Sequence, residues 1–341
     1  ASVAARGDAY FVEAGGSLSA TGEGANGIHA PSGDLAVSVL GSVSARHWGI
    51  YAAGWDSNIN VGASGSVYGE ERGIFVAGDP FTFHNLKNSG IVGGKDEGVR
   101  FHGYVLDVFN DGTIFGQKGT ALTFELIADA TGVRGYTRLV NSGSILGGGV
   151  GSQTAIMGSQ GRDLITNRGT ITGDVKLGDG DDTFDNREGT LISGVIDVGS
   201  GANTVWSGNG NDSINAGIGD DFIDAGTGQD VINWFGASGI TLNLANAARQ
   251  DTGVGFKTIL NVENATAGGA GNHRLTGNAG DNVLTTNLGN DTLDGGFGND
   301  TVNGNGGLDT ALYSGDIGAI VDLTLQRQAQ NTNYGLDTLL N

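Results

Sequence analysis

A nine-residue repeat in the second half of the chain restricts its possible folds more than any other feature. From Gly199 to Ile232, four successive nonapeptides carry two glycines, an Asp or Asn, and an aliphatic side chain at the same positions. Five further copies lie between Gly271 and Ala311. Glycines permit positive φ and close backbone approach, and the alternation after them places one aliphatic side chain inward. Each nonapeptide is therefore predicted to form a turn and a short strand.

Two nonapeptides are predicted to make one coil of a solenoid, so that residues 18 positions apart stack on one edge. The expected stacked pairs are Asp212 with Asp230, Asn203 with Asp221, Asn282 with Asp300, and Asp291 with Asp309. Carboxylates at strand spacing repel one another unless a cation lies between them. Oxygen ligands from Asp side chains and backbone carbonyls suit calcium better than magnesium. We therefore expect several calcium ions as cofactors.

These nonapeptides resemble the repeats-in-toxin (RTX) consensus Gly-Gly-x-Gly-x-Asp-x-U-x over about residues 177–341. The resemblance implies a parallel β-roll that binds calcium between its turns, and secretion from a bacterium by a type I exporter. The side chains that it implies as metal ligands are Asp182, Asn203, Asp212, Asp221, Asp230, Asn282, Asp291, Asp300 and Asp309. The glycines that it implies as ligands through their carbonyls are Gly199, Gly201, Gly208, Gly210, Gly217, Gly219, Gly226, Gly228, Gly289, Gly296, Gly298 and Gly307. His273 occupies one Asp position and departs from the pattern, because imidazole is a poor calcium ligand.

The first half repeats with a longer and less regular period. Phrases such as Gly41-Ser-Val and Gly112-Thr-Ile recur mostly every 20–26 residues, without helical periodicity. This pattern predicts a parallel β-helix of roughly eight coils, each burying aliphatic side chains against the next. Phrases such as Asn141-Ser-Gly-Ser-Ile look like those of bacterial autotransporter passengers and adhesins.

The predicted fold class is thus all-β: a right-handed parallel β-helix over 1–176 that continues into a calcium-binding parallel β-roll over 177–341. The roll contains two modules of about 79 residues, and the second is incomplete at Asn341. We expect one continuous rod. The chain also begins at Ala1 without an initiator methionine, so we expect it to be a piece of a longer protein.

The charge is unevenly distributed between the two halves of the chain. The chain has a net charge of −20, of which −16 lies after residue 170. An acidic chain is a poor partner for nucleic acid, whose phosphates require Lys and Arg. The absence of cysteine excludes disulfides and thiolate metal sites, and no apolar run is long enough to span a membrane.

No catalytic motif was recognised, so we expect a protein that is not an enzyme. One candidate column, predicted by stacking the coils, contains His47, Glu71 and Asp96, with Trp48, Arg72 and Glu97 beside it. Such a column could bind a uronate or perform acid–base chemistry, but a solvated row of ion pairs is the favoured interpretation.

Three functions remain open from the sequence. The first is an extracellular or cell-surface calcium-binding structural or adhesive protein, which could assemble with itself. The second is a polysaccharide lyase or epimerase-like enzyme on the β-helix. The third is a non-enzymatic module that binds cell-surface glycans.

Overall fold

The computed structural model describes residues 8–54, 56–128, 132, 135–149, 154–236, 238–315, 318–321 and 327–340. Every regular element within these ranges is a β-strand. Among them, no helix is long and apolar enough to cross a membrane. The chain divides into two compact units, residues 1–197 and 198–341.

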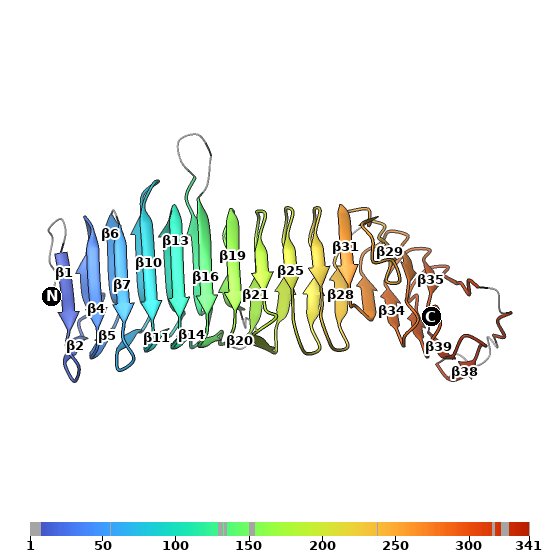
Figure 1. Ribbon diagram of the computed structural model, residues 1–341, viewed down its shortest axis with the longest axis horizontal. Helices are drawn as coiled ribbons and strands as arrows, with labels where there is room; N and C mark the ends of the chain where they lie inside the picture. The colour runs from blue at the N-terminus through green and yellow to red at the C-terminus, as the bar shows by residue number, and fades with distance from the viewer. Residues whose placement is uncertain are drawn as a thin grey trace. The chain divides into compact units, whose positions relative to one another are not determined.

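The first unit is a parallel β-helix whose coils each contribute one strand to each of three sheets (Figure 1). The first sheet contains β1 (Asp8–Val12), β4 (Leu35–Val39), β7 (Ser57–Val61), β10 (Phe83–Asn88), β13 (Val105–Asn110), β16 (Tyr136–Asn141), β19 (Arg162–Asn167) and β22 (Thr183–Asp185). The second contains β2 (Ser17–Ala20), β5 (Ser42–Ala45), β8 (Ser66–Gly69), β11 (Ile91–Gly94), β14 (Thr113–Gly116), β17 (Ser144–Leu146), β20 (Thr170–Thr172) and β23 (Thr190–Ile192). The third contains β3 (Ile28–Ala30), β6 (Trp48–Gly54), β9 (Arg72–Gly78), β12 (Glu97–Gly103), β15 (Leu122–Leu126), β18 (Thr154–Met157), β21 (Asp174–Lys176) and β24 (Val195–Asp197).

Alternation along each strand builds the core of this unit. In β4, Leu35, Val37 and Val39 are buried while the residues between them are not. Because parallel strands stack in register, Val37 lies beside Ile59 in the next coil, and each coil buries its aliphatics against its neighbours. The described strands of this unit make eight coils, as the sequence predicts.

A ladder of buried asparagine amides runs through the same unit. The side-chain nitrogens of Asn88, Asn110, Asn141 and Asn167 each donate to the amide oxygen of the asparagine one coil later, ending at Asn186. The four N···O distances are 2.6–2.8 Å. An amide both donates and accepts, so such a ladder satisfies its own members from coil to coil.

The second unit is a roll whose short strands are separated by glycine-rich turns. One sheet contains β26 (Ser213–Asn215), β28 (Val231–Trp234), β32 (Asn264–Ala267), β34 (Val283–Thr286), β36 (Thr301–Asn303), β39 (Leu336–Leu340) and β38 (Ala329–Asn331). The facing strands of the first repeat run are β25 (Thr204–Trp206), β27 (Phe222–Asp224), β31 (Phe256–Leu260) and β30 (Gln250–Asp251). Those of the second run are β29 (Thr241–Asn243), β33 (Arg274–Thr276), β35 (Thr292–Asp294) and β37 (Thr310–Ala311).

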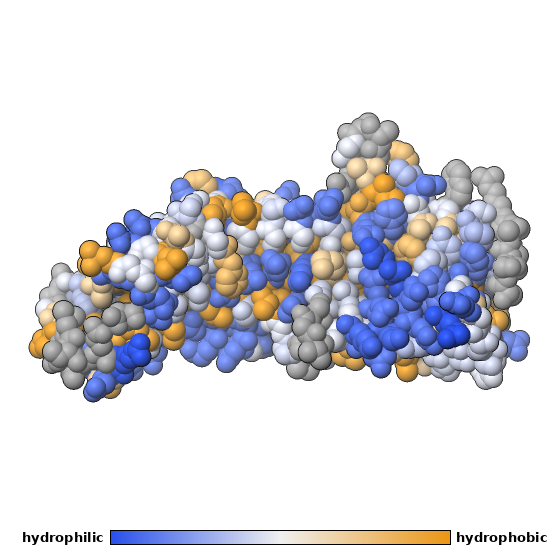
Figure 2. Space-filling model, turned by 180° about the vertical axis from the view of Figure 1, so that it is seen from behind, coloured by the Kyte–Doolittle hydropathy of each residue, from blue (hydrophilic) through white to orange (hydrophobic). Residues whose placement is uncertain are grey.

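The register of the roll confirms the predicted coil length. Ser213 pairs with Val231, and Val283 pairs with Thr301, 18 residues apart in both cases. The aliphatic position points inward in every nonapeptide but the last, so that Ile214, Ile232 and Leu284 are fully buried, whereas Ala311 is exposed. Hydrophilic residues cover much of the surface in Figure 2, with apolar residues interspersed. Together the two units show the parallel β-helix and β-roll solenoid that the repeats predict.

Candidate metal centre

The repeat aspartates lie at the end of each glycine-rich turn, immediately before a strand. Asp212 precedes β26, and Asp230 precedes β28 directly after it in the stack. Asp230 Oδ1 accepts a hydrogen bond from the backbone nitrogen of Asp212 at 2.7 Å. The sequence pairs predicted to stack are therefore in contact through the backbone of one residue and the side chain of the other.

The same contact repeats along both edges of the roll and forms a carboxylate ladder. In each rung, Oδ1 accepts from the backbone nitrogen of the corresponding residue one coil earlier. The further rungs are Asp221 with Asn203 (2.9 Å), Asp291 with His273 (2.7 Å), Asp300 with Asn282 (2.9 Å), Asp309 with Asp291 (2.9 Å) and Asp337 with Asp300 (3.0 Å). One oxygen of each carboxylate is thereby fixed in place by the neighbouring coil.

The second carboxylate oxygen is different. Oδ2 of Asp212, Asp230, Asp291 and Asp300 is buried and has no hydrogen-bond partner within the described part of the chain. A buried carboxylate oxygen without a partner is costly, because the group has lost its water and gained no donor in exchange. These atoms therefore require a cation or a proton.

The pKa values of these aspartates also indicate that their carboxylates require a cation or a proton. Burial, together with the neighbouring Asp230 carboxylate, raises the pKa of Asp212 to about 6. Burial likewise raises the pKa of Asp230 and of Asp300 to about 6. In the last coils of the first unit, burial raises the pKa of Asp182 to about 8. In each case the cost of burying the charged carboxylate exceeds what its hydrogen bonds return.

The turn glycines are required by close approach of consecutive coils. Gly226 has φ of 87°, and a Cβ on it would lie 1.9 Å from the carbonyl oxygen of Gly208. A Cβ on Gly307 would lie 1.6 Å from the carbonyl oxygen of Gly289. Only glycine allows the carbonyls of successive turns to come this near to one another. The predicted carbonyl ligands thus line the turns that carry the aspartates.

A second ladder, on the exposed side of the turns, runs in the opposite sense. It uses the Asp or Asn just before the repeat aspartate, whose Oδ1 accepts from a backbone nitrogen one coil later. Its acceptors and donors are Asn211 with Gln229, Asp220 with Phe256, Asn272 with Asn290, Asp281 with Asn299, Asn290 with Leu308 and Asn299 with Leu336, at 2.7–3.0 Å. These side chains hold successive turns together without contributing to the buried row.

Three predicted positions depart from the carboxylate pattern. The Oδ1 atom of Asn282 accepts from the backbone nitrogen of Asn278 in its own turn, at 2.8 Å. His273 is buried and uses Nδ1 to accept from the nitrogen of Ile240 at 3.0 Å. Burial lowers the pKa of His273, which favours the neutral imidazole that this contact requires. At the third position, Asn203, the side-chain nitrogen donates to the carbonyl oxygen of Val198 at 3.2 Å.

The structure adds members that the sequence analysis missed. Asp163 stands one coil before Asp182, and its backbone nitrogen donates to Asp182 Oδ1 at 2.8 Å. The segment Gly158-Ser-Gln-Gly161-Arg-Asp163 has the repeat spacing with serine in place of the second glycine, a signal that could have identified it. Glu263 Oε2 accepts from the nitrogen of Asp230 at 2.9 Å and continues that ladder with a longer acid.

The other candidate column is a row of ion pairs that is only partly exposed, because Glu97 is buried. His47 Nδ1 lies 2.8 Å from Glu71, and Arg72 Nε lies 2.6 Å from Glu97. Register places Trp48, Arg72 and Glu97 side by side, as the sequence predicts. Asp96 is exposed. Two cavities of this unit, of about 430 and 500 Å³, are lined by other residues.

The donor set of the roll fits calcium. Within the described ranges, no three His, Asp or Glu side chains gather into one metal-holding cluster. Instead, each turn offers one buried carboxylate and the carbonyls of its glycines. Calcium accepts such a mixed all-oxygen set, because it tolerates flexible geometry and takes both carboxylate and backbone carbonyl ligands. The unpartnered Oδ2 atoms are the positions at which the ion would replace lost water.

Comparison with protein families identifies part of the roll. The model for the RTX calcium-binding nonapeptide repeat (4 copies) matches residues 197–232, 267–302 and 276–311. Comparison with curated proteins and with solved structures gives no match. The matched segments contain Asp212, Asp230, Asp291 and Asp300, whose Oδ2 atoms lack partners.

Proposed function

We propose that this chain, which carries RTX calcium-binding nonapeptide repeats, is a secreted structural or adhesive protein whose roll folds when it binds calcium outside the cell. The observation that carries the proposal is the row of buried Asp Oδ2 atoms without partners within the described residues. Desolvated carboxylates in a stack oppose folding until a cation joins them.

Calcium supplies positive charge between turns when it is bound. The chain's own residues do the rest: Asp212, Asp230, Asp291 and Asp300 present their free oxygens, and the flanking glycines present carbonyls. Because Oδ1 of each carboxylate is already held by the preceding coil, the orientation of Oδ2 is set once two coils have stacked. We expect the remaining predicted ligands, among them Asp182, Asp221 and Asp309, to differ in how strongly they contribute to calcium binding.

The concentration difference across a cell boundary would drive this folding. A ligand that binds only the folded state stabilises it by mass action, by about 2.7 kcal/mol per site when it exceeds its dissociation constant 100-fold. Calcium sites of extracellular modules have dissociation constants of about 10⁻⁴ to 10⁻³ M. At cytosolic calcium such a roll would stay unfolded, and outside the cell it would fold.

Titration of the metal-free protein with calcium tests this proposal. We expect far-ultraviolet circular dichroism to gain β signal with calcium and to lose it again in excess EGTA. The matched control is magnesium at equal concentration, which should give a much smaller gain because it prefers a tight octahedron and retains water. An unchanged spectrum in EGTA would refute calcium-dependent folding.

A glycan-binding role is a second candidate, favoured by one cavity of the first unit. This cavity, of about 430 Å³, is lined by Asp34, Asp56 and Asp107 and by Phe83, which is exposed. An exposed ring beside polar acceptors is a common arrangement for holding a sugar. Binding to immobilised glycans that is lost in Phe83→Ala and kept in Phe11→Ala, an exposed ring elsewhere, would support it. Equal binding by both variants would contradict it.

A further inference from the structure

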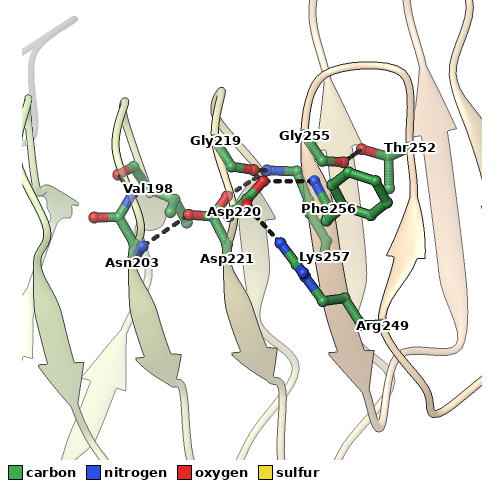
Figure 3. Close-up of polar contacts among 10 residues, drawn as sticks. All are labelled: Val198, Asn203, Gly219, Asp220, Asp221, Arg249, Thr252, Gly255, Phe256 and Lys257. Atoms are coloured by element: carbon green, nitrogen blue, oxygen red, sulfur yellow. Dashed lines mark hydrogen bonds and ion pairs between the residues drawn. The ribbon is translucent and has the colours of Figure 1, made fainter.

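Lys257 is a buried lysine at the edge of the roll where a calcium ligand is predicted. It lies in β31, one position before Thr258, which pairs with Phe222 of β27. Register therefore places Lys257 beside Asp221. Neither side chain is exposed to solvent, and Lys257 Nζ forms an ion pair with Asp221 Oδ2 (Figure 3).

The same ammonium group contacts a second predicted calcium ligand. Lys257 Nζ donates to the carbonyl oxygen of Gly219 at 3.1 Å. One cation thus contacts a repeat carboxylate and a repeat glycine carbonyl together, as calcium is expected to do elsewhere in the roll. Asp221 Oδ2 is satisfied by this lysine, whereas Oδ2 of Asp212, Asp230, Asp291 and Asp300 has no partner among the described residues.

The loop that carries Lys257 is fixed to the preceding coil on both sides of the turn. Gly219 donates to the carbonyl oxygen of Val254 at 3.0 Å, and Asp220 Oδ1 accepts from the nitrogen of Phe256 at 2.8 Å. Thr252 donates through both its backbone and its hydroxyl to Gly255, at 3.0 and 2.8 Å (Figure 3). The ammonium group is therefore positioned by backbone contacts and not by its ion pair alone.

The second module contains the same turn, 79–80 residues later, with the opposite charge. Gly298 donates to the carbonyl oxygen of Tyr334 at 3.0 Å, and Asn299 Oδ1 accepts from Leu336 at 2.9 Å. These contacts match those of Gly219 and Asp220 in the first module. The residue that corresponds to Lys257 is Asp337.

Asp337 behaves as a further rung of the carboxylate ladder. Its Oδ1 accepts from the nitrogen of Asp300 at 3.0 Å, and its Oδ2 accepts from the hydroxyl of Thr332. The pair Asp221 and Lys257 sums to zero charge, whereas the pair Asp300 and Asp337 sums to −2. A divalent cation is needed to neutralise only the second pair.

We propose that Lys257 is a tethered cation that takes the place of calcium at the Asp221–Gly219 turn, so that this junction forms without metal while the equivalent Asp300–Asp337 junction takes a calcium ion. The inference rests on the proposed calcium binding of the roll. A tethered ammonium competes at a high effective concentration, and it is present at any calcium level. The first module therefore contains one coil edge that is closed before calcium arrives.

Counting calcium ions in the full chain by native mass spectrometry and titration calorimetry tests the inference. We expect Lys257→Asp to bind one ion more than the parent, and Asp337→Lys to bind one ion fewer. The matched control is Arg249→Met, which removes an exposed cation paired with Asp220 and should leave the count unchanged. Lys257→Asp that folds in calcium with the parental count would overturn the inference.

Three further outcomes can be told apart. If Lys257→Asp fails to fold in calcium, Asp337→Lys decides, and a parental count in that variant overturns the inference. If the parent binds no calcium, the proposed function fails and this inference falls with it. If the parent binds calcium but the counts of both variants equal its own, only the present inference fails.

Hydrogen exchange in EGTA gives a readout independent of ion number. We expect backbone amides of Thr258 and Ile259 to be protected in the calcium-free parent at least 10-fold more than those of Thr338 and Leu339. Lys257→Met should abolish that difference, because methionine keeps the volume and removes the charge. Equal protection of the two segments in the parent would contradict the inference.

Discussion

The two units carry buried polar rows of opposite chemistry. In the first unit the row consists of asparagine amides, each of which donates to the next. In the second it consists mainly of carboxylates, which accept and cannot donate when ionised. The amide row is complete as it stands, whereas the carboxylate row leaves buried oxygens without donors in the described part of the roll. The side chain in one column thus decides whether the stacked coils satisfy their own polar atoms or leave some without a donor.

Removal of calcium should produce the largest difference between the two units in protection from hydrogen exchange. In excess EGTA we expect amides of 198–341 to lose protection from hydrogen exchange, except near Lys257, while those of β4, β7 and β13 keep it. The reason is that only the carboxylate row needs an added cation. The measurement is peptide-resolved exchange with and without calcium. Equal loss of protection in both units would contradict the expectation that only the second unit depends on calcium.

Placing a carboxylate in the amide row should have the next largest effect. Asn141→Asp removes the donor to Asn167 Oδ1 and buries a charge. We expect the free energy of unfolding of the first unit to fall by about 3 kcal/mol, with calcium or without it. Urea titration measures this. Asn60→Asp, on a half-buried strand position, is the matched control and should cost less than about 1 kcal/mol.

The reverse exchange, an amide in place of a carboxylate in the second unit, should have a smaller effect and should stabilise the calcium-free roll. Asp230→Asn keeps an oxygen to accept from Asp212 and replaces the unpartnered oxygen by a neutral group. We expect the calcium-free roll to gain about 1 kcal/mol and its stabilisation by calcium to shrink. Asp251→Asn, at an exposed position of β30, should change neither quantity. An unaltered calcium response in Asp230→Asn would remove this residue from the ligand set.

The pH dependence should be the most gradual effect. The pKa of Asp212, Asp230 and Asp300 is raised to about 6 in the folded state, above its unfolded value. The folded roll therefore binds more protons than the unfolded chain between about pH 4 and 6. In metal-free buffer its stability should be highest below that range and fall as the pH rises through 6. Calcium should reverse the trend, since it competes with those protons. Far-ultraviolet circular dichroism of the metal-free protein at several pH values tests this, and a β signal that grows from pH 4 to 7 would contradict it.

Much of the roll follows from its period. The 18-residue coil and the stacked pairs Asp212–Asp230 and Asp291–Asp309 were predictable, because glycine and aspartate recur in phase and one turn geometry serves all copies. The amide row was less visible, although Asn141 and Asn167 share an Asn-x-Gly phrase. The phrase marks a turn, but the inward direction of the amide depends on coil stacking.

Lys257 could not be predicted from the repeat. It lies outside both nonapeptide runs and 36 residues after Asp221, and a single lysine ordinarily indicates a solvated surface. Its burial follows from the antiparallel pairing of β30 with β31, which brings a non-repeating loop onto the edge of the stack. In the second module, the corresponding turn makes the same contacts and carries Asp337. Only this comparison shows that Lys257 occupies the position of an aspartate in that turn.

The opposed directions of the two turn ladders have a mechanical consequence. Each coil is held by its neighbour through Asp Oδ1 in one direction and through the preceding Asn or Asp in the other, as at Asp230–Asp212 and Asn211–Gln229. Under tension, we expect the roll to resist until both sets of bonds fail together and then to release one coil. Each released coil of 18 residues adds about 60 Å of chain where the stack had occupied about 5 Å. We therefore expect such a roll to act as an extensible spring whose threshold force depends on the surrounding calcium concentration.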